Sequence, residues 1–153
     1  MAIQYDAVLN AVAENLPVVG VPELVLDILL TDGWNSGIDW FSLPPHIQKY
    51  IEDKYCVDHP GNDDDGYMTT LWGLKHSRGD EPAVVYPNIR CKVWYKCGIE
   101  HRDGDLPSKF IFYGIWFTKK GRKHRDGDLP AYVLYDGSME WWKNGVQYDF
   151  FEI

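Results

Sequence analysis

Hydrophobic and polar positions follow a helical period in the first third of the chain and a two-residue period in most of the rest. Apolar residues recur at helical spacing from Tyr5 to Leu16, and residues 22–30 are apolar on most sides. A third helix is predicted from Ser42, which we expect to be its N-cap, to Tyr55. The pattern therefore predicts three short helices, which form a helical N-terminal cap over residues 1–56.

Beyond residue 66, short apolar segments alternate with glycine-containing turns. Residues 131–135 and 138–143 predict two strands joined by a tight turn at Asp136-Gly137, and Asn144-Gly145 predicts the next turn. The equivalent pairs are residues 110–113 with 115–118 and residues 83–86 with 91–96. Hairpins without helices between them predict an antiparallel meander of roughly six to eight strands. The expected fold class is α+β, with the N-terminal helices packed on this meander.

One seven-residue sequence, HRDGDLP, occurs twice, from His101 to Pro107 and from His124 to Pro130. A weaker copy begins at His76, so the period is 23 to 25 residues. A glycine stands three positions before each histidine, and the last glycine, Gly145, is followed at that distance by Tyr148. The period predicts about 3.5 copies of one β-hairpin unit over residues 67–153.

We interpret the repeated sequence as a structural corner between units. Its glycine permits a positive φ, its proline fixes the start of the next strand, and its aspartates can accept backbone N–H bonds. Arg102 and Arg125 have carboxylates within reach, and pairing them would tie one unit to its neighbour. The predicted corner residues are His76, Gly79, Asp80, Pro82, His101, Arg102, Asp103, Gly104, Asp105, Pro107, His124, Arg125, Asp126, Gly127, Asp128 and Pro130. The predicted turn residues are Gly73, Gly98, Gly121, Asp136, Gly137, Asn144 and Gly145.

The repeated histidines and aspartates also suggest chemistry. Equivalent residues in successive two-strand units lie about 9.6 Å apart, whereas each ligand of a zinc ion approaches it to about 2 Å, so the histidines cannot share one zinc ion. His101 with Asp105 is a candidate general base for a small hydrolase, but no serine or cysteine nucleophile is placed beside it. We expect no enzyme activity, metal or cofactor, and keep the His-Asp hydrolase as an alternative.

The two parts of the chain are joined by residues 57–66, which we interpret as an acidic linker loop because of their Gly, Asn, Asp and Pro content. Asp63, Asp65 and Gly66 match three positions of a calcium-binding EF-hand loop. Gly61 and Trp72, however, stand where its first and last carboxylates would be. We therefore expect no calcium site in this loop.

Composition narrows the class of partner. The chain has 153 residues, 15% of them aromatic, and a formal net charge of −8, which argues against binding to nucleic acid. Only residues 119–123 gather several cations. The longest apolar stretch, residues 24–30, is too short to span a bilayer. Three cysteines without metal-binding spacing indicate a reducing, intracellular setting.

The order of Asp-Gly, aromatic strand, Asn-Gly and His, with a period near 23, resembles the MORN class of β-hairpin repeats. The segment from His124 to Ala131 resembles a MORN-like HRDGDLPA variant found in proteins of giant DNA viruses of amoebae. This resemblance covers residues 66–153 and implies a non-enzymatic scaffold or interaction protein of viral origin, in the virion or the infected host cell. The departures from the pattern are Ser77, Arg78 and Glu81 in the first copy and Tyr148 at the last histidine position.

We expect the partner to be a viral or host protein that binds the sheet surface or the exposed row of corners. Self-association is an alternative, because the last strand of an array can pair with another copy. An F-box-like adaptor for a ubiquitin ligase is another, since residues 21–28 and 43–51 are similar to the opening of an F-box. Five aromatic residues belong either to the buried end of the core or to a contact surface: Trp141, Trp142, Tyr148, Phe150 and Phe151.

Overall fold

The computed structural model describes residues 39–61 and 66–149, and the chain divides into two compact units between Tyr55 and Cys56. The two helices predicted before residue 39, the first F-box-like stretch, the acidic residues 62–65 and the last two predicted aromatic contacts, Phe150 and Phe151, lie outside the described residues. Each unit is described by itself.

The described part of the first unit contains a short 3-10 helix, η2 (Trp40–Ser42), and the helix α3 (Pro45–Tyr55). Proline suits the first position of α3, because the N–H it lacks has no intrahelical partner there. Ile47 and Ile51, one turn apart, are buried. The prediction of this helix is confirmed, but Ser42 is not its N-cap. The carbonyl of Pro44 accepts the first helical N–H bonds, and the Ser42 hydroxyl donates to the Asp39 carbonyl.

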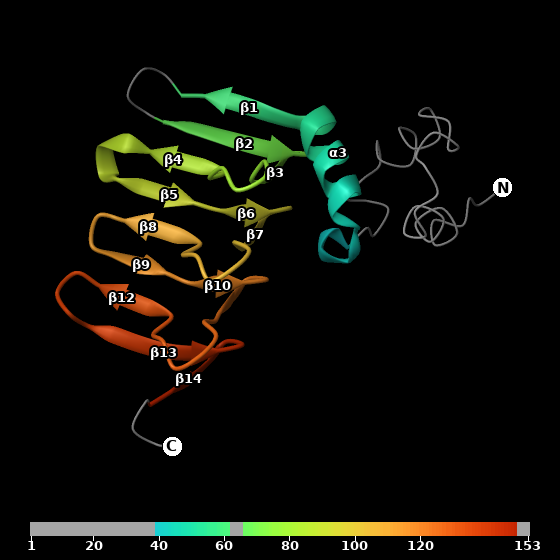
Figure 1. Cartoon of the computed structure of the whole chain (residues 1–153). Coiled ribbons are helices and arrows are strands. Elements are labelled where there is room, and N and C mark those ends of the chain that lie inside the picture. Colours follow the sequence, from blue (N-terminus) through green and yellow to red (C-terminus); the bar gives the residue numbers. More distant parts are fainter. Residues whose placement is uncertain (1–38, 62–65, 150–153) are drawn as a thin grey trace. The chain divides into compact units, whose positions relative to one another are not determined.

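The second unit is mainly an antiparallel β-meander (Figure 1). Its strands are β1 (Cys56–Pro60), β2 (Tyr67–Leu71), β3 (Leu74–Lys75), β4 (Val84–Tyr86), β5 (Cys91–Val93), β6 (Tyr95–Lys96), β7 (Ile99–Glu100), β8 (Lys109–Ile111), β9 (Gly114–Trp116), β10 (Thr118–Lys119), β11 (Arg122–Lys123), β12 (Tyr132–Leu134), β13 (Met139–Lys143) and β14 (Val146–Tyr148). A short 3-10 helix, η4 (Pro87–Ile89), lies between β4 and β5.

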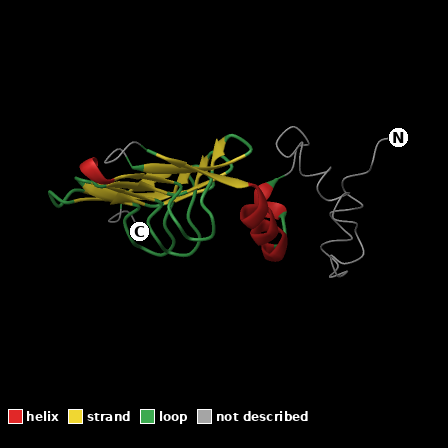
Figure 2. Cartoon of the chain, turned by 90° about the horizontal axis from the view of Figure 1, so that it is seen from above, coloured by secondary structure: helices red, strands yellow, loops and turns green. Residues whose placement is uncertain are grey.

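The strands of the main sheet follow the order of the sequence, β1-β2-β4-β5-β8-β9-β12-β13-β14, and β3 pairs with β2. The pairs β6–β7 and β10–β11 form two small sheets of their own. Seen from above, the strands lie in one layer, and several connecting loops gather on one side of it (Figure 2). The predicted meander is confirmed, with ten strands in the main sheet among the described residues, which is more than we expected.

The predicted linker is wrong in its first part. Residues 56–60 form β1, which pairs with β2 along its whole length. Two cross-strand contacts hold it: the Thr69 hydroxyl donates to Asp58 Oδ1 over 3.0 Å, and His59 Nε2 lies 2.8 Å from Thr70 Oγ1. The segment is therefore a strand stabilised by polar cross-strand contacts, although its composition is typical of a loop.

Two of the three predicted returning strands divide into two pieces, whereas the third forms the unbroken strand β13. Trp94 separates β5 from β6, and Phe117 separates β9 from β10. The second piece pairs with the strand that follows a two-residue turn, as in Lys96↔Ile99. Both turn residues have positive φ in all four such turns, which is typical of type I′ hairpins. These pairs are Trp72-Gly73, Cys97-Gly98, Lys120-Gly121 and Asn144-Gly145.

One face of the main sheet carries the core of this unit. Register aligns Met68, Val84, Val93, Lys109 and Trp116 across neighbouring strands. Side chains directly opposite each other project from the same face. Three of these residues, Val84, Val93 and Trp116, are buried. This face therefore supplies much of the apolar surface that the unit removes from water.

Candidate functional site

The arginines of the two HRDGDLP corners connect successive units. Arg102 binds both carboxylate oxygens of Asp80, through Nε at 2.8 Å and Nη2 at 2.9 Å. Its Nη1 donates to the Pro107 carbonyl, and its guanidinium carbon lies 3.9 Å from the centre of the Trp94 ring. The same guanidinium is thus held by the preceding corner, by its own corner and by an aromatic ring.

Arg125 repeats this arrangement one unit later. It binds both oxygens of Asp105, donates to the Pro130 carbonyl, and stacks 3.8 Å from the centre of the Phe117 ring. The pairing of neighbouring units that we expected from the sequence is therefore present. We call these pairs the corner ladder.

The first pair in the corner ladder is different. Arg78 stands one position later in its corner than Arg102 and Arg125 do, and it contacts Asp58 of β1 through one nitrogen, at 3.2 and 3.3 Å. A second nitrogen donates to the Cys56 carbonyl. The ladder thus extends to the strand that the sequence had suggested to be a linker.

The corner histidines also reach across to the next unit. Nδ1 of His76, His101 and His124 accepts the backbone N–H of Cys97, Lys120 and Asn144, respectively, at 2.9 to 3.0 Å. Each accepted N–H belongs to the first residue of a type I′ turn. The backbone N–H of the following glycine donates to the carbonyl just before the histidine, as Gly121 does to Glu100. Each corner therefore holds the hairpin turn of the next unit.

This geometry differs from the general base that the sequence had suggested. Nε2 of His101 lies 3.0 Å from Asp103 Oδ1, whereas the Asp105 carboxylate binds Arg125. His124 likewise lies 2.9 Å from Asp126. The predicted pair of His101 with Asp105 is wrong, because the neighbouring arginine takes that carboxylate. Both ring nitrogens of His101 and of His124 are occupied by hydrogen bonds within the protein.

The carboxylates of the corners are electrostatically stabilised. The hydrogen bond from Arg102 lowers the pKa of Asp80, and the contact with His124 lowers the pKa of Asp126. Bonds from Thr69 and Arg78 lower the pKa of Asp58. On the core side of the sheet, burial raises the pKa of Tyr132 to about 12. Asp58, Asp80 and Asp126 are thus ionised at neutral pH, and Tyr132 keeps its proton.

A different surface is exposed on the opposite face of the main sheet. Register places seven residues side by side across seven strands, six of them apolar, and none of the seven is buried. We call this row the open face; its residues are Tyr67, Val85, Lys92, Phe110, Ile115, Val133 and Met139.

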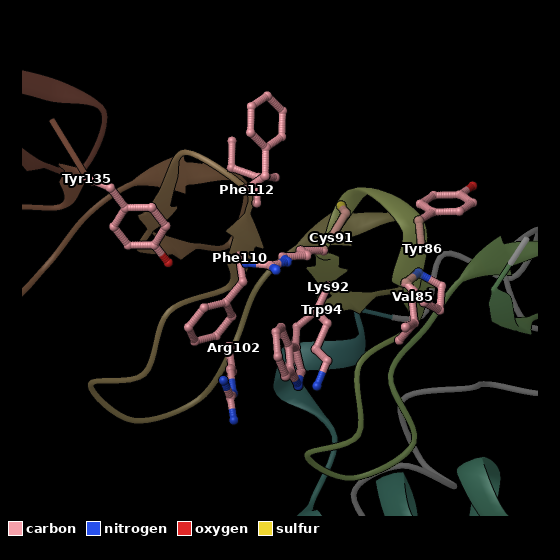
Figure 3. Close-up of a pocket in the computed structure, with 12 residues that line it drawn as sticks. Val85, Tyr86, Cys91, Lys92, Trp94, Arg102, Phe110, Phe112 and Tyr135 are labelled. Carbon is pink, nitrogen blue, oxygen red and sulfur yellow. The ribbon is translucent and has the colours of Figure 1, made fainter. Parts of the chain in front are cut away.

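A groove of about 780 Å³ lies over β4, β5 and β8 and includes part of the open face. Val85, Lys92 and Phe110 contribute to it, and the Trp94 and Phe110 rings are in contact with their centres 5.7 Å apart. Figure 3 shows Lys92 beside Trp94, with Tyr86 and Tyr135 toward opposite ends of the view. Phe112 and Tyr135 also line the groove, and each is about two-thirds exposed, at 66% and 65%.

Of the residues that line the groove, only Arg102 was among those predicted from the sequence. A signal was nevertheless present, because Tyr67, Lys92, Ile115 and Met139 each stand six positions before a turn glycine. Val85, Phe110 and Val133 likewise each stand three positions after a corner proline. The repeat therefore marks the row, although only the strand register shows that the two sets lie side by side.

The predicted aromatic contacts near the C-terminus are described in part. Trp141, Trp142 and Tyr148 are all half-buried. The indole N–H of Trp142 donates to Glu140, and Lys123 lies 4.2 Å from the centre of the Trp142 ring. These residues contribute to the end of the folded array.

The described residues hold no group of three or more His, Cys, Asp or Glu side chains placed to bind a metal ion. Within the same residues, no helix has the length and hydrophobicity needed to cross a membrane. Cys56, Cys91 and Cys97 form no disulfide. The chain matches no known family model, no curated protein and no solved structure.

Proposed function

We propose that the chain is a non-catalytic scaffold of MORN-like repeats that binds another protein through its open face. The supporting observation is the row of six apolar residues and one lysine, none of them buried, that crosses the sheet beside exposed Phe112 and Tyr135. Contiguous apolar surface of this kind on a soluble domain is typical of a protein-binding site. Aromatic side chains are also the residues that most often dominate binding energy.

The corners support the scaffold part of the proposal. A general base needs a ring nitrogen that can take a proton from a substrate. In His101 and His124, one nitrogen accepts a turn N–H and the other contacts an aspartate. These histidines therefore serve best as fixed connections between units, which keep the sheet surface in one shape.

The resemblance of the corners to repeats of giant DNA viruses favours a viral or host protein as the partner, inside the infected cell or the virion. The net charge of −8 favours a protein over a nucleic acid. The proposal does not require a metal or a cofactor.

The test compares three forms of the full chain as bait in lysates of expressing or infected cells. The groove variant is Phe112→Ser with Tyr135→Ser, and both side chains are mainly exposed, so we expect little loss of stability. The control is Leu106→Ser with Leu129→Ser, which removes two exposed apolar corner residues outside the groove. A specific partner should be retained by the wild type and the control and lost with the groove variant.

Each retained protein is then purified, and its affinity for the three baits is measured directly. Equal affinity for the groove variant and the wild type would refute the open face as the binding surface. Loss of binding in the control alone would instead assign the contact to the row of corners.

A further inference from the structure

The groove on the open face combines aromatic side chains with positive charge. Its charged lining residues are Arg90, Lys92 and Arg102, and no acidic residue lines it. Arg102 is neutralised by Asp80 in the corner ladder. Arg90 and Lys92 are exposed and form no ion pair with any described residue. The groove therefore carries two uncompensated cations on a chain whose net charge is −8.

We propose that this groove binds an extended, acidic segment of a partner protein, whose every second side chain faces the groove and is in turn apolar or a carboxylate. This inference rests on the proposed function and specifies the chemistry of the partner. Opposite charge at the rim of an apolar contact raises the rate of association and selects against cationic competitors. Apolar side chains of the segment would lie against Val85 and Phe110, while its carboxylates meet Arg90 and Lys92.

The dimensions of the groove set the length of the segment. Val85, Lys92 and Phe110 are directly opposite one another on β4, β5 and β8, so the groove crosses three neighbouring strands. Strands are spaced about 4.8 Å apart, and an extended chain rises about 3.3 Å per residue. Tyr86 and Tyr135 also line the groove and extend it beyond these three strands. A segment of about five to eight extended residues would therefore fill it.

A single-stranded nucleic acid is the main competing occupant, since aromatic rings and cations together also bind bases and phosphates. Such binding needs a positive track along the backbone of the nucleic acid. Here Arg102 is already paired with Asp80, which leaves two cations within the groove. The charge distribution therefore favours an acidic protein segment.

The test uses labelled peptides of about eight residues and the full chain, with binding followed by fluorescence anisotropy. The first peptide has glutamate and phenylalanine in turn at every second position, with glycine between them. The second peptide has lysine in place of glutamate, and the third has serine in place of phenylalanine. A thymidine oligonucleotide of similar length is the fourth probe. We expect the acidic, aromatic peptide to bind at least about tenfold more tightly than each of the other three.

Charge reversal supplies the matched comparison. The double variant Arg90→Glu with Lys92→Glu should lower the affinity for the acidic peptide at least about tenfold and raise the affinity for the lysine peptide. Lys119→Glu with Arg122→Glu makes the same change in net charge outside the groove, and should leave both affinities within about twofold. Circular dichroism melts of both variants show whether each is folded.

The outcomes separate the inference from the function on which it rests. The proposal of an acidic segment is refuted if the lysine peptide or the oligonucleotide binds as tightly as the acidic peptide. It is also refuted if the two charge-reversed variants have the same affinity for the acidic peptide. The proposed function survives that result as long as a captured protein still depends on Phe112 and Tyr135. If no captured protein depends on those two residues, the proposed function itself fails.

Discussion

Replacing Arg102 with alanine should show how strongly one corner holds the next. The change removes a bidentate ion pair with Asp80, whose side chain is 62% exposed, so that pair contributes only about 1 kcal/mol. Stacking on Trp94 adds about 1 kcal/mol, and the hydrogen bond to the Pro107 carbonyl about 1 kcal/mol. We therefore expect Arg102→Ala to lower the free energy of unfolding by about 3 kcal/mol.

The ion pair is separated from the other contacts by a double-mutant cycle. Asp80→Ala removes the pair but leaves the stacking, so it should cost about 1 kcal/mol, and the coupling energy between the two changes should be about 1 kcal/mol. The control is Arg122→Ala, an exposed arginine outside the corner ladder, which should change stability by less than about 0.5 kcal/mol.

The measurement is urea unfolding followed by circular dichroism, because Trp94 lies against the mutated side chain and its fluorescence would change locally. The midpoint and the slope give the free energy of unfolding for each variant. Added salt should reduce the coupling energy and leave most of the remaining loss from Arg102→Ala. If Arg102→Ala costs no more than Arg122→Ala, the corner ladder does not stabilise the array.

Three other predictions concern the turns, the histidines and the acid response. Lys120→Asn should raise the free energy of unfolding by about 0.5–1 kcal/mol, since asparagine tolerates the positive φ of this turn, and the reciprocal Asn144→Lys should lower it by a similar amount in the same urea assay. His76→Ala should cost about 3 kcal/mol and His124→Ala about 1 kcal/mol, because the N–H that His76 binds is buried and the one that His124 binds is exposed; equal losses would contradict this gradient. Because Arg102 lowers the pKa of Asp80 below 3.8, this carboxylate stabilises the fold above that pH and loses the effect as the pH falls further. Asp80→Asn should therefore reduce the loss of stability measured between about pH 5 and about pH 2.

Most of the fold and of the corner contacts that could be predicted from the sequence followed from the repeat. Glycines at a fixed offset from His101 and His124 place the hairpin turns, and the corner arginines point to carboxylates of a neighbouring unit. These features are local, so the types of residue and their spacing are enough to predict them. The third helix is predictable for the same reason, because Pro45, Ile47 and Ile51 specify its start and its buried side.

Contacts that depend on strand register were not predictable in the same way. The acceptor role of His101 requires that the turn at Lys120 lie against it, and no spacing within one corner reveals this. The strand β1 is polar at Asp58 and His59, and the side chains of Thr69 and Thr70 on β2 bond to them across the strand pair. Composition alone therefore made residues 57–60 resemble a loop.

The division between constant and varied positions suggests how such an array can bind selectively. Every corner must hold the same kind of turn, so the same side chains recur in each unit, as Asp80 and Asp105 do. The open face has no such requirement, and its equivalent positions differ, with Tyr67, Lys92 and Ile115 in successive units. A surface that differs along its length offers a partner one favourable register, whereas an identical row would offer several of equal energy. The fixed corners thus keep the backbone regular, and in the proposed function the variation between units would supply the specificity of binding.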